Sequence, residues 1–171
     1  MTMEPLMTII FAISMGISLA LLSVSVSKAG GIPVSLSSTY YALGKNGWIF
    51  QVLLASSAGL LLPVWIESSG QGHEWMAFIS CMGLLFVAAA PAFRMQMQGA
   101  VHYTSAAVCC IAAVCWQTAE GLWDVTLWFT LIFGTLCLMK RKQWCWWMES
   151  AVIGSVYFSL IRMLYYKDFM S

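Results

Sequence analysis

Six apolar runs account for most of this chain and decide what it can fold into. They cover residues 7–26, 48–65, 75–92, 100–116, 122–139 and 144–166. An α-helix rises 1.5 Å per residue, so about 20 residues cross the ~30 Å hydrocarbon core of a bilayer. Only 9% of the residues are charged, whereas a soluble domain has about 25%. The pattern predicts an all-α bundle of six transmembrane helices that forms one domain over residues 1–171. The lipid bilayer is the expected surroundings and partner of this bundle.

The charged residues between these runs are segregated by sign. The first, third and fifth connections carry bases and no acid, whereas the termini and the other two connections carry acids, with Lys167 beside Asp168 as their one base. Basic connections of multi-pass proteins stay in the cytoplasm. We therefore expect residence in the cell (cytoplasmic) membrane with both termini outside. The bases are Lys28, Lys45, Arg94, Lys140, Arg141 and Lys142, and the acids are Glu4, Glu67, Glu74, Glu120 and Asp124.

Tryptophans stand at the ends of two runs. Trp48 and Trp65 bound the second run, and Trp144, Trp146 and Trp147 follow the basic triplet 140–142. Tryptophan is enriched where the hydrocarbon meets the headgroups. We therefore expect these five side chains to anchor their helices at the membrane interfaces.

Small residues predict where helices approach one another. The run 100–116 is rich in alanine and cysteine, which predicts a central, closely packed helix. Small residues four positions apart also allow close helix contact. Ala55 with Gly59, and Ser150 with Gly154, have this spacing, so a close contact is expected at each pair.

The connection 27–47 is long for so small a bundle and is rich in hydroxyl groups. Long connections in compact proteins are disproportionately functional. Its apolar members Ile32, Val34 and Leu36 indicate that it packs back onto the bundle. The alternative is a short interfacial helix with no further task.

Several polar groups are expected at one depth near the cytoplasmic side. Glu149 lies seven residues beyond Lys142, roughly 10 Å into the bilayer, and ionisable groups there normally face the bundle interior in pairs. His102 begins the fourth run and Arg94 follows the third. The sequence predicts a polar pocket open to the cytoplasm or, alternatively, a pairing of Glu149 with Arg94 or His102 that only holds helices together. The candidate ligand-binding residues are Ser35, Ser38, Tyr40, Tyr41, Arg94, His102 and Glu149.

Arg162 is a second charge within an apolar run. It lies thirteen residues beyond Glu149, about 20 Å further along a helix, so the two residues do not form one site. We expect Arg162 to form a structural ion pair near the outer leaflet or to extend toward the interface.

Motifs that specify chemistry are missing from the sequence. HExxH, GxSxG and phosphate-binding glycine loops do not occur, and the six cysteines lack paired metal-ligand spacing. A net charge of +1 gives no basis for nucleic-acid binding. We expect no metal, no cofactor, no nucleic-acid partner and no assigned catalytic residue. A serine of the first connection with His102 and Glu149 resembles a hydrolytic set only in sharing a depth, so enzymatic activity is left open and disfavoured.

Four segments carry a resemblance to other proteins. They are 33–41 (PVSLSSTYY), 48–50 (WIF), 90–93 (APAF) and 101–103 (VHY). In these the chain resembles short bacterial and phage-type membrane proteins of unknown function. The resemblance implies a shared six-helix bundle and a joint role for the first connection and His102, and it implies no activity.

The sequence thus favours a binding or regulatory membrane protein. The pocket would hold a small or lipid-like ligand, or a partner membrane protein, and a homodimer is compatible with the same pattern. A small proton-linked transporter working as a dimer is the alternative, because Glu149 with His102 could carry protons. A lipid-modifying membrane enzyme is a third reading.

Overall fold

The computed structural model describes residues 5–92 and 95–169. Within these residues the fold is all-α and contains no strand, which confirms the predicted fold class. Three short 3-10 helices, η1 (Gly44–Asn46), η2 (Ala90–Ala92) and η3 (Arg141–Gln143), lie in connections. The α-helices are α1 (Pro5–Ala29), α2 (Ser38–Ala42), α3 (Trp48–Ser68), α4 (Glu74–Ala89), α5 (Met95–Ala119), α6 (Trp123–Met139) and α7 (Trp144–Phe169).

Some of these helices are long and apolar enough to cross a membrane. Segments Pro5–Ala29, Gly44–Ser68 and Gly99–Ala119 meet both conditions alone. The pair Trp123–Met139 and Arg141–Leu164 meets them only together, across a 118° bend, so the described residues contain three candidate spans, or four with the bent pair counted as one. α4 has 16 residues and is about 24 Å long at the helical rise. The fold is therefore compatible with a membrane protein.

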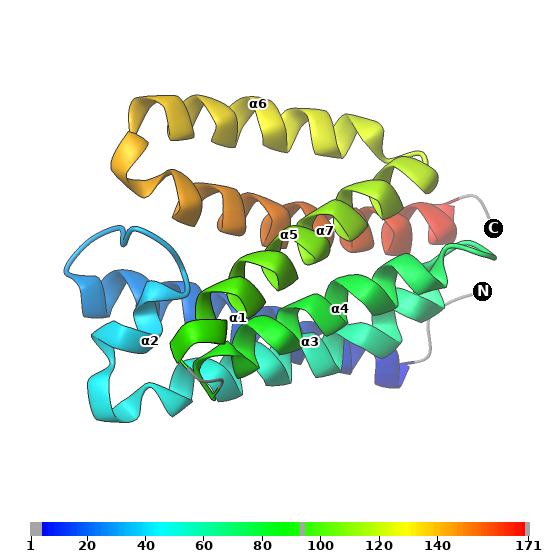
Figure 1. Cartoon of the computed structure of the whole chain (residues 1–171). Coiled ribbons are helices and arrows are strands. Elements are labelled where there is room, and N and C mark those ends of the chain that lie inside the picture. The colour runs from blue at the N-terminus through cyan, green and yellow to red at the C-terminus, as the bar shows by residue number, and fades with distance from the viewer. Residues whose placement is uncertain (1–4, 93–94, 170–171) are drawn as a thin grey trace.

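The long helices run back and forth between two ends of the molecule (Figure 1). One end, left in Figure 1, holds loop 30–37, η1 and η3, and we call it the basic end. The other holds turns 69–73 and 120–122 and the first turn of α1, and we call it the acidic end. The basic end carries Lys28, Lys45, Lys140, Arg141 and Lys142, and the acidic end carries Glu67, Glu74, Glu120 and Asp124.

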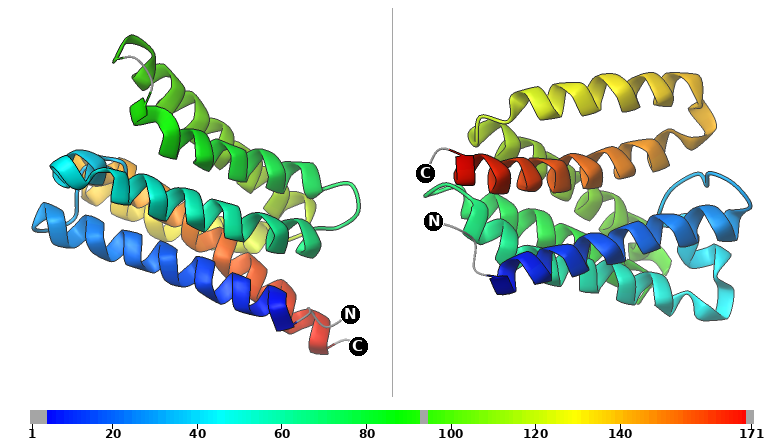
Figure 2. Two further views of the ribbon diagram at one scale, coloured as in Figure 1. Left: turned by 90° about the horizontal axis from the view of Figure 1, so that it is seen from below. Right: turned by 180° about the vertical axis from the view of Figure 1, so that it is seen from behind.

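The helices pack in sequence order. α3 lies between α1 and α4, α5 packs chiefly on α4, and α6 packs chiefly on α7. Figure 2 shows α1 on one flank and the α4–α5 pair on the other. The α6–α7 hairpin makes fewer contacts with the remaining helices. The hairpin therefore meets the rest of the bundle through α5, which contacts both of its helices, and through the contact of α7 with α3.

The structure agrees with only part of the prediction that five tryptophans are interface anchors. Trp48 and Trp144 are exposed, but Trp65 is 1% exposed and its ring meets Trp116 edge-on at 5.2 Å. Trp146 is also buried, and its indole N–H donates to Ser25 Oγ at 3.2 Å. The interface prediction is wrong for Trp65 and Trp146. The reason is that an indole ring offers a large apolar area to the core between helices.

α5 is not the central helix that its small residues predicted. Tyr103 is 73% exposed and Ile111 is 64% exposed, so one long side of α5 is uncovered in the monomer. Small residues of α5 make a close contact with α4. A Cβ placed on Gly83 would lie 2.8 Å from Cβ of Cys109 and 2.9 Å from the carbonyl oxygen of Ser105.

Only one of the two small-residue pairs lies at a close helix contact. A Cβ placed on Gly154 would meet Cε1 of Phe129 at 3.0 Å, so α7 and α6 approach closely there. A Cβ on Gly59 would have no neighbour within 4 Å. The spacing identified small surfaces, but not which of them face another helix.

Candidate functional site

The connection after α1 folds back onto the bundle. Gly30 (φ 65°) and Gly31 (φ 154°) turn the chain with positive φ values that favour glycine. Leu36 is then 4% exposed and Ile32 packs against the same core, so the predicted packing is confirmed for these two residues. Val34 is 63% exposed, and for it the prediction is wrong.

Three hydrogen bonds fasten this loop to the start of α7 and the turn before it. The Trp146 backbone N–H donates to the Val34 carbonyl at 3.2 Å. The Gln143 side-chain amide donates to the Ile32 carbonyl at 2.9 Å. The Leu36 backbone N–H donates to Oε2 of Glu149 at 2.6 Å. The last contact uses Glu149, one of the candidate ligand-binding residues named from the sequence.

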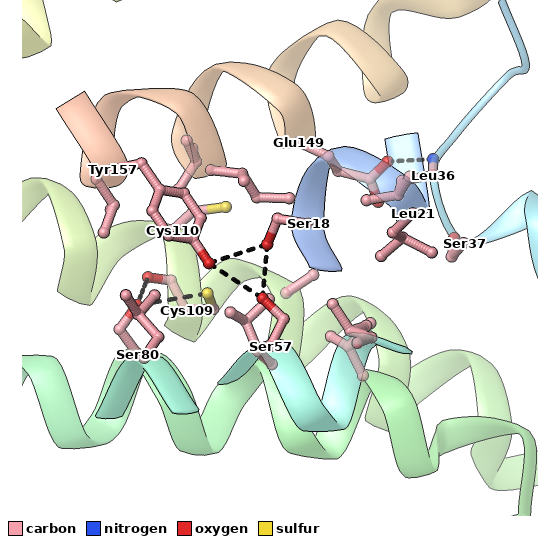
Figure 3. A pocket seen from close by; sticks show the side chains of 18 of the residues that line it. Ser18, Leu21, Leu36, Ser37, Ser57, Ser80, Cys109, Cys110, Glu149 and Tyr157 are labelled. Atoms are coloured by element: carbon pink, nitrogen blue, oxygen red, sulfur yellow. Dashed lines mark hydrogen bonds between the residues drawn. The ribbon is translucent and has the colours of Figure 1, made fainter. Parts of the chain in front are cut away.

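A cavity of about 70 Å³ lies behind Leu36, between α1, α3, α4, α5 and α7. Leu36 and Ser37 line it from the loop, and Glu149 lines it from α7 (Figure 3). One water molecule needs about 10–15 Å³ measured in this way, so there is room for several waters or a small ligand. Most of the remaining wall is aliphatic or aromatic, from residues such as Leu21, Leu54 and Val152.

A cluster of four hydroxyl groups lies in and beside the cavity wall. The Tyr157 hydroxyl lies 2.6 Å from Ser14 Oγ, 2.9 Å from Ser18 Oγ and 3.1 Å from Ser57 Oγ. Ser18 and Ser57 are 2.6 Å apart, and Ser14 donates to the Ser57 carbonyl at 2.9 Å. Figure 3 shows the hydroxyls of Ser18, Ser57 and Tyr157 converging from α1, α3 and α7. The cluster ties three helices together at the cavity.

A second polar contact in the wall joins α4 to α5. Ser80 Oγ donates to the Cys109 carbonyl at 3.0 Å and lies 3.5 Å from its sulfur. Both residues are buried, and both line the cavity with the neighbouring Cys110. Ser80 is thus satisfied locally, within the close α4–α5 contact.

The predicted hydroxyl residues of the first connection lie outside this cavity. Ser38 Oγ donates to the Ser35 carbonyl at 2.6 Å, and the Ser38 N–H donates to Ser35 Oγ at 3.1 Å. These bonds shape the start of α2 and leave Ser37 to line the cavity. The rings of Tyr40 and Tyr41 meet edge-on at 5.3 Å, and Tyr41 is 67% exposed.

His102 and Glu149 are not brought together in the cavity. His102 is partly buried with its ring edge-on to Tyr103 at 5.5 Å, and it does not line the cavity. Arg94, the other predicted partner, lies outside the described residues. Among the side chains that the structure describes, Arg162–Asp124 and His73–Glu120 lie within ion-pair distance, and neither contact includes Glu149.

Those two ion pairs lie at the acidic end. Arg162 pairs with Asp124 between α7 and α6, which confirms the expected ion pair of Arg162. Glu120 accepts the Gly70 backbone N–H at 2.6 Å and lies 3.1 Å from Nδ1 of His73. These contacts join the turn after α3 to the end of α5, far from Glu149 along the helices.

The cavity beside Glu149 is the candidate site of this protein. Among the described residues, no group of three His, Cys, Asp or Glu side chains is placed to hold a metal ion. Comparison with protein-family models, curated proteins and solved structures finds no match to this chain. The candidate function therefore rests on the Glu149 cavity and its hydroxyl cluster.

Proposed function

We propose that the protein is a six-span integral membrane protein with its basic end in the cytoplasm and both termini outside. The alternation of the six long helices between two ends supports this reading. So does the gathering of five bases at one end and four acids at the other, because basic loops are retained in the cytoplasm. The shorter helices α4 and α6 span by local thinning of the bilayer around them.

In that setting the protein binds a small or lipid-like ligand in the Glu149 cavity. The observation that carries this proposal is the wall itself, in which one carboxylate and a few hydroxyls face an otherwise apolar space. Binding sites for small molecules are built in this way, because apolar surface supplies affinity and a few polar groups fix orientation. The loop that carries Leu36 covers the cavity on the basic side, so access is from the cytoplasm.

A pair of neighbouring alanines on α5 allows a matched test. Ala106 lines the cavity, whereas the next residue along the helix, Ala107, is exposed. Ala106→Leu fills part of the cavity and Ala107→Leu adds the same volume outside it. A small-molecule panel is scored by the thermal stabilisation of the purified protein in detergent. The proposal requires compounds that stabilise the wild type and Ala107→Leu but not Ala106→Leu, and it fails when no compound behaves in this way.

Proton-linked transport by a dimer is a second candidate, favoured by the position of Glu149 in a cavity wall. A carboxyl group there can exchange a proton with the cavity as the loop opens and closes. In proteoliposomes loaded with a pH-sensitive dye, a transporter produces solute-dependent proton movement that Glu149→Gln abolishes. A binding protein produces no such movement with either variant.

A further inference from the structure

Glu149 has more acceptor capacity than its surroundings use. A carboxylate offers about four lone-pair sites, and among the described residues the Leu36 N–H is its one hydrogen-bond donor, to Oε2. None of the residues lining the cavity is Lys, Arg or His. A carboxylate removed from water is costly unless a cation or further donors compensate it.

The other polar groups of the wall do not supply that compensation. The hydroxyls of Ser18, Ser57 and Tyr157 are bonded to one another. In Figure 3 they form a group apart from Glu149, whose carboxylate points toward Leu36 and Ser37. Most of the side chains lining the remaining space are apolar, and Leu21, Leu54 and Val152 are aliphatic. The space next to Glu149 thus combines one carboxyl group with a mostly apolar surface.

We propose that the ligand of this cavity is a small organic ammonium ion. Its N–H groups donate to the oxygens of Glu149, and its short alkyl part lies against the aliphatic wall. This rests on the proposed binding function and names the class of ligand. A carboxylate ligand is repelled by Glu149, and a neutral alcohol of the same length gains the apolar contact without the charge-assisted hydrogen bond. That difference corresponds to roughly tenfold or more in dissociation constant.

Three probes of equal chain length separate these contributions. The full chain, purified in detergent at constant ionic strength, is titrated with n-butylammonium chloride, butan-1-ol and sodium butyrate, and thermal unfolding is followed. Glu149→Gln retains a carbonyl that can accept the Leu36 N–H but removes the negative charge. Glu67→Gln removes one exposed carboxylate at the acidic end and is the matched control. We expect butylammonium to stabilise the wild type and Glu67→Gln at concentrations at least tenfold below butan-1-ol, and to lose that advantage in Glu149→Gln.

The remaining outcomes distinguish a failure of the ammonium assignment from a failure of the proposed binding function. Equal stabilisation by butylammonium and butan-1-ol overturns the ammonium assignment and leaves a cavity that binds small molecules. An ammonium effect that survives Glu149→Gln also overturns it, because the ion then binds elsewhere. When no probe stabilises the wild type and no compound of the Ala106 test binds, the binding function itself falls.

Discussion

The backbone N–H of Leu36 donates to Oε2 of Glu149 at 2.6 Å, across 113 positions of sequence. The contact joins a loop to the first turns of α7 and closes the cavity on the basic side. The buried side chain of Leu36 fills the space at the cavity wall, and its backbone amide holds the loop to Glu149. A change at Glu149 that weakens this hydrogen bond is therefore expected to change the position of the loop.

We predict that Glu149→Ala loosens this loop. Removal of one hydrogen bond to a charged group costs about 1.5–3 kcal/mol, so amide exchange of a peptide containing Leu36 is expected to accelerate roughly tenfold or more. Hydrogen exchange with mass spectrometry measures this directly. Glu149→Gln keeps an acceptor and should exchange at a rate closer to wild type. The same rate in all three proteins would show that the bonds of Trp146 and Gln143 alone hold the loop.

A second prediction concerns the Tyr157 hydroxyl, which contacts three serines from α1 and α3. Tyr157→Phe leaves the ring in place and removes these contacts, while the bonds of Ser14 and Ser18 to Ser57 remain. Buried hydrogen bonds between membrane helices are worth about 0.6 kcal/mol each on average, so we expect a loss of about 1–2 kcal/mol in SDS-induced unfolding. Tyr103→Phe, at a 73% exposed position, is the control and should change stability little. Equal stability of Tyr157→Phe and wild type would mean that the serines re-pair without cost.

The helices could be predicted from the sequence because long apolar runs leave the backbone few choices. An apolar run in a bilayer must satisfy its N–H and C=O groups internally, which a helix does. The ranges 48–65 and 122–139 thus fall within or beside α3 (Trp48–Ser68) and α6 (Trp123–Met139).

The hydroxyl cluster could not be predicted from the sequence, because the hydroxyl of a helical serine can donate either to its own helix or to a neighbouring one. Ser23 donates to the Leu19 carbonyl of its own helix at 2.8 Å, whereas Ser14 and Ser18 bond to other helices. Which choice is made depends on how α1 is rotated. The spacing of Ser14, Ser18 and Ser25 on one side of the helix was the available signal. A similar predicted depth was not enough to place His102 beside Glu149, because depth does not fix the direction in which a side chain points.

A third prediction tests the close α4–α5 contact. Gly83→Ala places a methyl group 2.8 Å from Cys109 Cβ and 2.9 Å from the Ser105 carbonyl oxygen, which forces the helices apart. Overpacking of this kind costs about 1–3 kcal/mol, and we expect that loss in unfolding by SDS. Gly59→Ala is the matched control, because a Cβ there has no neighbour within 4 Å and the substitution favours the helix by about 0.5–1 kcal/mol. Destabilisation by both substitutions to the same degree would contradict the packing described for α4 and α5.

The final prediction concerns orientation, which decides the side from which the cavity is reached. A C-terminal fusion to alkaline phosphatase, which is active only outside the cytoplasm, is expected to be active. A fusion of the same enzyme after Lys142 is expected to be inactive, because basic residues such as Lys140, Arg141 and Lys142 favour retention of a connection in the cytoplasm. Neutralising these three bases should raise the activity of the second fusion, whereas neutralising the acids Glu67 and Glu74 should not, since acids contribute little to orientation. Activity after Lys142 with no activity at the C-terminus would invert the topology and place the Leu36 loop on the outer side.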